Sequence, residues 1–156
     1  MNQTFSMEAL YQTAEIELIY KSKVKASERP KIITSKDAYN LLLQTWDENK
    51  MELQEQFKIL LLNRGNKVVG IYEVSTGGIT GTVADPRLIF TAALKASAVA
   101  LILSHNHPGS SLKPSTADIA LTQKIKEAGR FLDINVIDHL IICNEGYYSF
   151  ADEGAL

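Results

Sequence analysis

The sequence has 156 residues, of which 46% are hydrophobic and 22% are charged, and its formal net charge is −2. Such a chain can bury one sizeable core, so we expect a single globular domain. The isoelectric point is about 5.9. This excludes a dedicated nucleic-acid binder of strongly basic composition. The sequence has one cysteine, which excludes an internal disulfide, a four-cysteine zinc site and CxxC redox chemistry.

The first part of the chain, residues 1–30, is expected to form an N-terminal arm and a first strand. Apolar residues alternate with polar ones over residues 15–25, which predicts a strand with one buried face. The stretch Lys21–Lys36 holds six of the 16 Lys and Arg residues, and we interpret it as a solvated strand and loop in preference to a phosphate-binding surface. We find neither a signal peptide nor an apolar run of about 18 residues, so we expect a cytoplasmic protein without membrane spans.

Helices and strands alternate through the rest of the chain. Ser35 and Asp85 are predicted N-caps, and Gly129 is predicted to close the last helix. Short apolar runs separated by turns predict the strands. The expected elements are helices over 36–49, 86–97 and 116–128, strands over 57–62, 67–75, 79–83, 98–103, 134–143 and 147–150, and a polar loop over 104–114. This order predicts an α/β domain in three layers, with a single mixed β-sheet flanked by helices.

Two histidines, His105 and His107, directly follow the predicted buried strand over 98–103. Residues two apart in an extended backbone point to the same side, so the two imidazoles can converge on one ion. Asp118 comes eleven residues after His107, in the first turn of a predicted helix. Two imidazole nitrogens and one carboxylate form the ligand set of a catalytic zinc site, which keeps a fourth position for water. The carboxyl end of a buried strand is also where α/β sheets usually place their sites.

Three nearby residues have simpler interpretations. Ser115 and Asp118 have the spacing of a capping box, and an aspartate is favoured in a first helical turn by the helix dipole. Taken together with the histidines, a metal-binding role for Asp118 is favoured, and Ser115 can both cap the helix and direct its hydroxyl at the site. His139 lies in an apolar strand, so we interpret it as a core histidine, or one that supports a ligand, rather than as a ligand.

The spacing of these residues resembles a known motif. His105-Asn106-His107, seven residues, Ser115, two residues and Asp118 resemble the JAMM motif of MPN-domain metalloproteins. The sequence is also similar to the RadC family of bacterial proteins in the segments LILSHNHPGSSLKPSTAD and AGRFLDINVIDHLII. The resemblance implies a RadC-like JAMM/MPN domain over 31–156 with a three-layer architecture like that of cytidine deaminases. It also implies one zinc ion per chain, bound by His105, His107 and Asp118.

The motif further includes a glutamate at the start of an early strand. Glu55 matches it because a largely apolar run follows, whereas Glu52 and Glu73 are the alternative candidates. An acid beside a strand is by itself most simply a solvated residue, so the resemblance alone selects Glu55. It implies that Glu55 is the general base that activates a zinc-bound water and that Ser115 donates to the oxyanion. The loop sequence Pro-Gly-Ser departs from the Pro-Ser-Gly that is more frequent in the family.

The function favoured by this pattern is zinc-dependent hydrolysis of amide or isopeptide bonds in a protein or peptide substrate. The alternatives are a RadC-like protein associated with DNA repair or mobile elements, and a non-catalytic MPN scaffold, which the complete ligand set disfavours. Longer relatives carry an N-terminal helix-hairpin-helix region, which we do not expect in this sequence, so we expect only weak association with DNA. A zinc nucleotide deaminase would need HxE and PCxxC motifs.

Overall fold

The computed structural model describes residue 20, residues 22–78 and residues 81–156. Its five strands form one sheet in the order β2-β1-β3-β4-β5, in which β3 and β4 run parallel and the other neighbours run antiparallel. The elements are η1 (Ala26–Glu28), α2 (Ser35–Thr45), α3 (Glu48–Met51), β1 (Gln56–Leu62), β2 (Val68–Thr76), α4 (Pro86–Lys95), β3 (Ala100–Asn106), α5 (Thr116–Phe131), β4 (Asn135–Cys143) and β5 (Gly146–Ser149). No described helix is long and apolar enough to span a bilayer.

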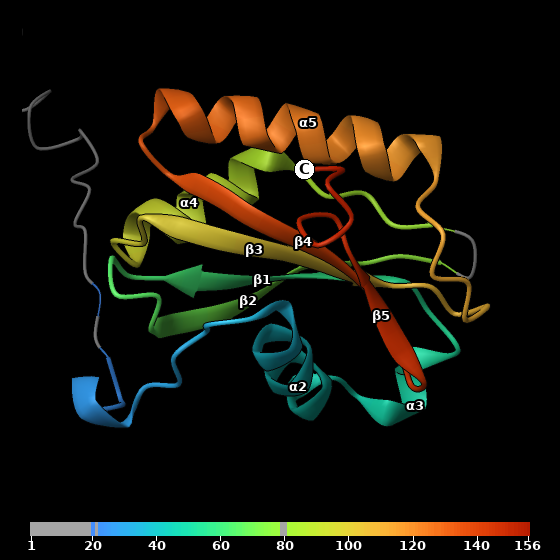
Figure 1. Cartoon of the computed structure of the whole chain (residues 1–156), viewed down its shortest axis with the longest axis horizontal. Coiled ribbons are helices and arrows are strands. Elements are labelled where there is room, and N and C mark those ends of the chain that lie inside the picture. The colour runs from blue at the N-terminus through green and yellow to red at the C-terminus, as the bar shows by residue number, and fades with distance from the viewer. Residues whose placement is uncertain (1–19, 21, 79–80) are drawn as a thin grey trace, which may run out of the picture.

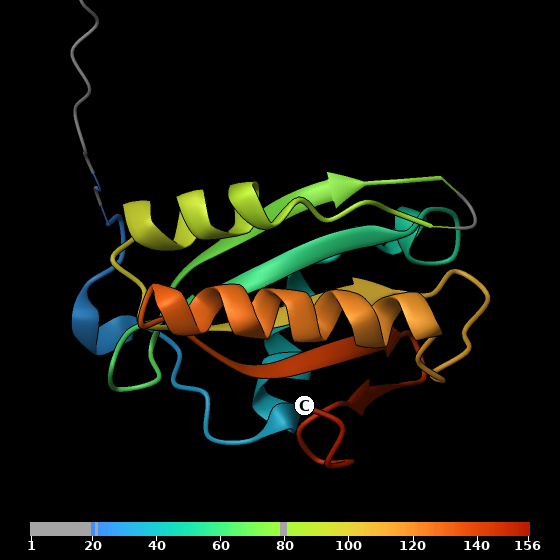
Figure 2. The ribbon, with the colours of Figure 1, turned by 90° about the horizontal axis from the view of Figure 1, so that it is seen from above.

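Helices cover both faces of the sheet. Helices α4 and α5 lie over one face, and α2 and α3 lie under the other (Figure 1). Seen from above, α4 and α5 run side by side across the sheet (Figure 2). The prediction of a three-layer α/β domain with a single mixed sheet is therefore confirmed.

The two central strands carry a core on each face. Every residue of β1 and β3 is buried, as expected for strands that are covered on both sides. The odd-numbered apolar residues of both strands pack under α4 and α5, and the even-numbered ones pack against α2. At the end of β3, this alternation directs His105 to the α5 face and Asn106 to the α2 face.

Strand β3 is longer than predicted, and this places a histidine inside the sheet. The polar loop was expected to begin at residue 104, but Ser104, His105 and Asn106 still pair with neighbouring strands. His105 lies opposite Phe57 on β1 and Ile141 on β4. The predicted loop boundary is wrong because a run of polar side chains is typical of a solvated loop, whereas these three are fully buried.

Two further predicted strands fall partly outside the described residues, and their described parts are not strands. The strand predicted over 15–25 lies mostly outside them, and residues 22–25 are exposed and form no strand, so they offer no buried face. Of the strand predicted over 79–83, residues 79–80 lie outside the described part and residues 81–83 are not in the sheet. The Gly78 amide instead donates to the Gly81 carbonyl over 3.0 Å.

Several helix ends also differ from the prediction. Helix α2 begins one residue earlier, because Thr34 and Asp37 form its capping box, and it ends at Thr45 before the separate short helix α3. Gly129 does not close α5, which continues to Phe131. A Cβ at Gly129 would lie 2.3 Å from the Ile134 carbonyl oxygen, so this glycine permits the close approach of the following strand.

Candidate metal centre

The carboxyl end of β3 presents both motif histidines to one cavity. The His105 ring lies parallel to the Phe57 ring, with centroids 6.0 Å apart and planes 2° apart. His107 follows the strand, and its Nδ1 atom lies 2.6 Å from the Ser111 carbonyl oxygen. A carbonyl can only accept a hydrogen bond, so Nδ1 of His107 carries a proton and, in the neutral ring, Nε2 keeps the lone pair.

Asp118 reaches the same cavity from the first turn of α5. Its Oδ2 atom accepts hydrogen bonds of 2.7 Å from both the backbone amide and the hydroxyl of Ser115. The Ser115 Oγ in turn accepts from the Asp118 amide over 3.1 Å, which completes the predicted capping box. Oδ1 of Asp118 lies 3.3 Å from Nε2 of His105. Capping and ligation are therefore not alternatives, because they use different carboxylate oxygens.

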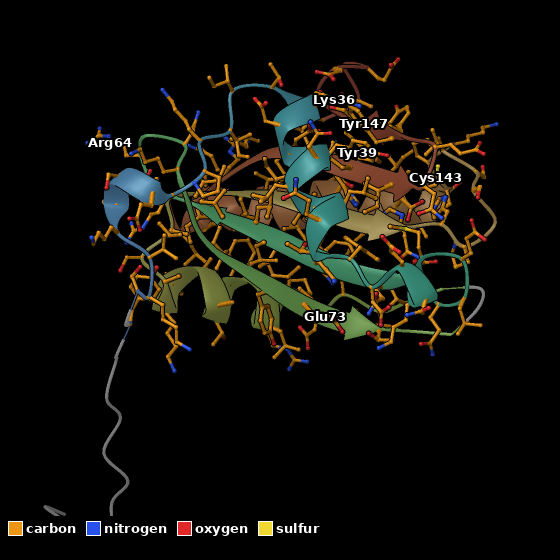
Figure 3. The ribbon with its side chains drawn as sticks, turned by 90° about the horizontal axis from the view of Figure 1, so that it is seen from below. Lys36, Tyr39, Arg64, Glu73, Cys143 and Tyr147 are labelled. Atoms are coloured by element: carbon orange, nitrogen blue, oxygen red, sulfur yellow. The ribbon has the colours of Figure 1, made fainter. Side chains whose placement is uncertain are left out.

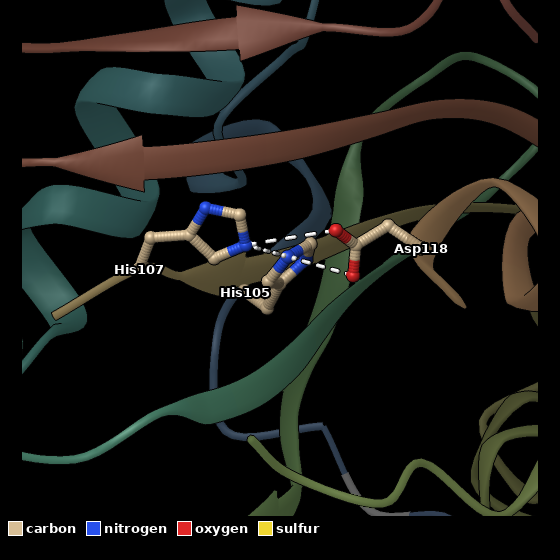
Figure 4. Close-up of side chains that lie close together, drawn as sticks. All are labelled: His105, His107 and Asp118. Atoms are coloured by element: carbon tan, nitrogen blue, oxygen red, sulfur yellow. Dashed lines mark hydrogen bonds and ion pairs between the residues drawn. The ribbon is translucent and has the colours of Figure 1, made fainter. Parts of the chain in front are cut away.

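The three candidate ligands converge closely (Figure 4). The two Nε2 atoms of His105 and His107 are 3.0 Å apart, and Nε2 of His107 lies 3.6 Å from Oδ2 of Asp118. Ligand atoms at about 2.0–2.1 Å from a tetrahedral zinc ion stand roughly 3.3 Å from one another. The Nε2–Nε2 distance of 3.0 Å and the 3.3 Å between Nε2 of His105 and Oδ1 of Asp118 are close to that spacing, so the three residues could hold such an ion.

A chain of hydrogen bonds fixes the tautomer of His105. The Thr122 hydroxyl donates to the Asp118 carbonyl over 2.6 Å, so it must accept from Nδ1 of His139 over its other 2.6 Å contact. His139 is fully buried, which lowers its pKa well below the ordinary value, so its ring is neutral. Its Nε2 therefore accepts from Nδ1 of His105 over 2.8 Å. As a result, Nε2 of His105 carries a lone pair that is directed at the cluster.

The carboxylate and the two imidazole lone pairs of the cluster favour a bound cation. Burial raises the pKa of Asp118, but the adjacent rings of His105 and His107 and the Ser115 hydroxyl outweigh it, and the pKa falls below the ordinary value. The same carboxylate raises the pKa of His107 against the opposing effect of burial. Two imidazole lone pairs 3.0 Å apart beside a carboxylate repel one another unless positive charge lies between them. A proton on His107 supplies that charge in part, and a divalent metal ion supplies it fully.

The cluster opens into a cavity of about 360 Å³, which Glu55 and Ser115 also line. Glu55 directly precedes β1, and extending the antiparallel register Phe57↔His105 by two residues sets Glu55 opposite His107. The charge of Glu55 contributes to the raised pKa of His107. The Ser115 hydroxyl donates to Asp118, so to serve an oxyanion it would have to turn. The catalytic roles of Glu55 and Ser115 stay predictions.

The two alternative acids lie elsewhere. Glu52 is exposed and accepts a hydrogen bond of 3.0 Å from the Asn144 side chain. Glu73 on β2 lies on the α2 side of the sheet (Figure 3), where it is 3.6 Å from the Lys58 ammonium. Of the three candidate acids, only Glu55 lines the cavity.

The basic stretch Lys21–Lys36 lies away from this cavity in its described part. Arg29 donates to the Ser22 hydroxyl over 3.0 Å. The Lys36 ammonium lies 4.7 Å from the ring centroid of Tyr39 and 5.6 Å from that of Tyr147, at the outer end of α2 (Figure 3). Arg29 and Lys36 thus contact neighbouring side chains of the protein. These contacts accord with the interpretation of Lys21–Lys36 as a solvated surface segment. Weak association with DNA stays a prediction.

Two residues of the centre were not predicted from the sequence. Thr122 could have been found because it lies four residues after Asp118, on the same side of α5. Asn106, between the two histidines, gives no signal of its own, because its side chain points to the opposite face of the sheet. His139, interpreted as a core or supporting residue, contacts His105 and lies outside the ligand cluster.

Comparison with known proteins identifies the family. Residues 32–155 match the family described as RadC-like JAB domain. A UPF0758 protein of Flavobacterium johnsoniae is 48% identical over 124 residues, which cover 80% of this chain and 53% of that protein. A UPF0758 protein of Porphyromonas gingivalis is 46% identical over 104 residues, which cover 66% of this chain and 46% of that protein. The chain thus spans about half the length of these curated relatives. By these matches, and by its motif and fold, the chain belongs to the RadC family.

Proposed function

We propose that this protein is a zinc-dependent hydrolase of amide or isopeptide bonds. The observation that carries the proposal is the convergence of two imidazole lone pairs and one free carboxylate oxygen beside Glu55 in one open cavity. Three protein ligands next to an acid suit a catalytic metal site better than a structural one, which four ligands would close. The choice of an amide or isopeptide bond rests on the resemblance to JAMM metalloproteins.

The residues of the centre divide the chemistry between them. His105, His107 and Asp118 would hold the zinc ion, which when bound lowers the pKa of a coordinated water to about 7 and polarises a carbonyl group. Glu55, opposite His107, accepts the proton of the attacking water and passes it to the leaving amine. Ser115 holds the Asp118 carboxylate in place and, on turning, can donate to the developing oxyanion.

The proposal is tested first by metal content and then by cleavage. Protein purified without added metal is analysed for zinc, and then titrated with zinc in competition with a chromophoric chelator. We expect one zinc ion per chain, which is lost in His105→Ala and in His107→Ala. The zinc-loaded protein is then screened against peptide and isopeptide libraries. A wild-type protein that stays metal-free after zinc addition, or a fully loaded protein that cleaves nothing, would refute the proposal.

A further inference from the structure

Asn106, the residue between the two histidine ligands, makes three short hydrogen bonds on the other side of the sheet. Its side chain is fully buried. The amide nitrogen donates to the Met51 carbonyl over 2.6 Å and to the Gln54 carbonyl over 2.8 Å. The amide oxygen accepts from the backbone N–H of Gln56 over 2.7 Å. Both donors of the side chain and its acceptor are therefore used within one short segment of the chain.

These three partners lie on both sides of Glu55. Met51 ends α3, and Gln56 begins β1, so the segment between them connects the helix to the sheet. The backbone of Glu55 itself bonds to the other flank of the sheet, because its amide donates to the Gly78 carbonyl over 3.1 Å and its carbonyl accepts from Gly77 over 2.8 Å. The segment is thus held between Asn106 on one side and Gly77 and Gly78 on the other.

The amide group of asparagine suits this place for a physical reason. Gln56 is 1% exposed, so its N–H would be buried without a partner if Asn106 were absent. Alanine would lose all three bonds, and serine has only one proton for two carbonyl acceptors. Aspartate would place a negative charge against the carbonyl oxygens of Met51 and Gln54. A group with two donors and an acceptor is therefore needed to satisfy this segment.

We infer that Asn106 is a positioning residue that clamps the Glu55 segment onto the metal-binding strand. The segment of β3 that directs the His105 and His107 side chains into the cavity directs the Asn106 side chain to the opposite face of the sheet. The spacing between Glu55 and the ligands is therefore set within one stretch of β3. The inference rests on the proposed function for the role of Glu55, whereas the clamp itself is a property of the fold.

The test compares Asn106→Ala with Ser104→Ala. Ser104 is the matched control because it lies two residues earlier on the same face, is fully buried and donates to the Lys58 carbonyl over 3.0 Å. Hydrogen exchange is measured on a peptide covering residues 52–57, in the metal-free and the zinc-loaded protein. We expect Asn106→Ala to raise exchange there by about tenfold or more, and Ser104→Ala to leave it unchanged. Zinc affinity should stay close to that of the wild type in both variants.

Kinetics on a cleaved peptide give the second readout. Displacement of a base by about 1 Å costs on the order of 10²-fold in rate, so we expect Asn106→Ala to lower kcat by that order with KM little changed. Asn106→Ser, a smaller lesion, is measured in parallel in case the alanine variant does not fold. Unchanged exchange over 52–57 in the folded variant would overturn the clamp, and faster exchange with an unchanged kcat would overturn the positioning role. If the wild type proves inactive, the proposed function fails, and the exchange result alone decides the clamp.

Discussion

Nδ1 of His105 lies 2.8 Å from Nε2 of His139, and this contact determines which nitrogen of His105 faces the candidate metal site. The proton of His139 is directed by Thr122, whose hydroxyl is committed to the Asp118 carbonyl. One hydroxyl on α5 therefore orients a ligand on β3 through a buried histidine on β4. Replacing residues that support a metal ligand through hydrogen bonds, without binding the metal, typically lowers metal affinity by about 10–100-fold.

The Thr122 hydroxyl should therefore matter for zinc binding although it touches no ligand side chain. Thr122→Val keeps the volume but leaves the buried Nδ1–H of His139 without an acceptor, so we expect zinc affinity to fall about tenfold and the free energy of unfolding to fall by about 1–3 kcal/mol. Thr122→Ser retains the hydroxyl and should stay close to the wild type. Chelator competition and urea unfolding measure the two quantities. Equal zinc affinity in the valine and serine variants would contradict the relay.

Helix capping and metal binding by Asp118 should be separable by mutation, because Oδ2 contacts Ser115 and Oδ1 faces His105. Asp118→Asn keeps an oxygen for Ser115, so we expect the metal-free protein to lose about 1 kcal/mol or less of stability, whereas zinc affinity should fall steeply. Asp37→Asn is the matched control, because Asp37 caps α2 through the same pair of contacts with Thr34 and has no histidine nearby. Both variants are compared by thermal unfolding and zinc titration. Equal zinc affinity in the two would reduce Asp118 to a helix cap.

Glu55 should act in turnover and not in metal binding. Glu55→Gln keeps size and hydrogen bonding but removes the base, so we expect unchanged zinc affinity and a loss of hydrolysis on the order of 10²-fold or more. Glu52→Gln is the control, because Glu52 is exposed and does not line the cavity. Steady-state rates on any cleaved peptide decide between them. A Glu55→Gln variant as active as the control would reject Glu55 as the base.

The sheet and the ligand cluster could be predicted from the sequence because both follow from local patterns. Apolar runs identify β1, β3 and β4, and the spacing of His105, His107 and Asp118 identifies the candidate ligands. What the sequence could not give was the burial of the motif itself. The polar residues at the end of β3 resemble a loop, and only pairing with two neighbouring strands keeps them inside the sheet.

The contacts that orient the centre were also beyond local patterns. Thr122, His139 and Asn106 act on residues that are distant in sequence, and each would be an ordinary buried polar residue if considered alone. Their roles depend on the register between strands and on the placement of α5 over β4. A motif of spaced ligands therefore specifies which atoms can meet, whereas the fold specifies their protonation and their support.

The α2 face of the sheet carries a buried charge whose effect on stability should depend on pH. Lys58 is 6% exposed, and its ammonium donates to the Thr45 carbonyl over 3.1 Å and lies 4.5 Å from the Trp46 ring centroid. Burial lowers the pKa of Lys58, and the nearby Glu73 carboxylate offsets this in part. The folded protein therefore releases this proton at a lower pH than the unfolded chain does.

The sign of the pH dependence follows from which state binds more protons. Between the folded pKa of Lys58 and the ordinary value of 10.5, the unfolded chain binds the proton more often, so stability rises with pH in that window. Lys58→Met removes this contribution and nearly keeps the volume. We expect the stability of the wild type relative to Lys58→Met to increase as pH approaches 10.5, by up to about 1.4 kcal/mol per pH unit. Urea unfolding of both proteins from pH 7 upward measures the difference, and a difference that stays flat would show that Lys58 titrates alike in both states.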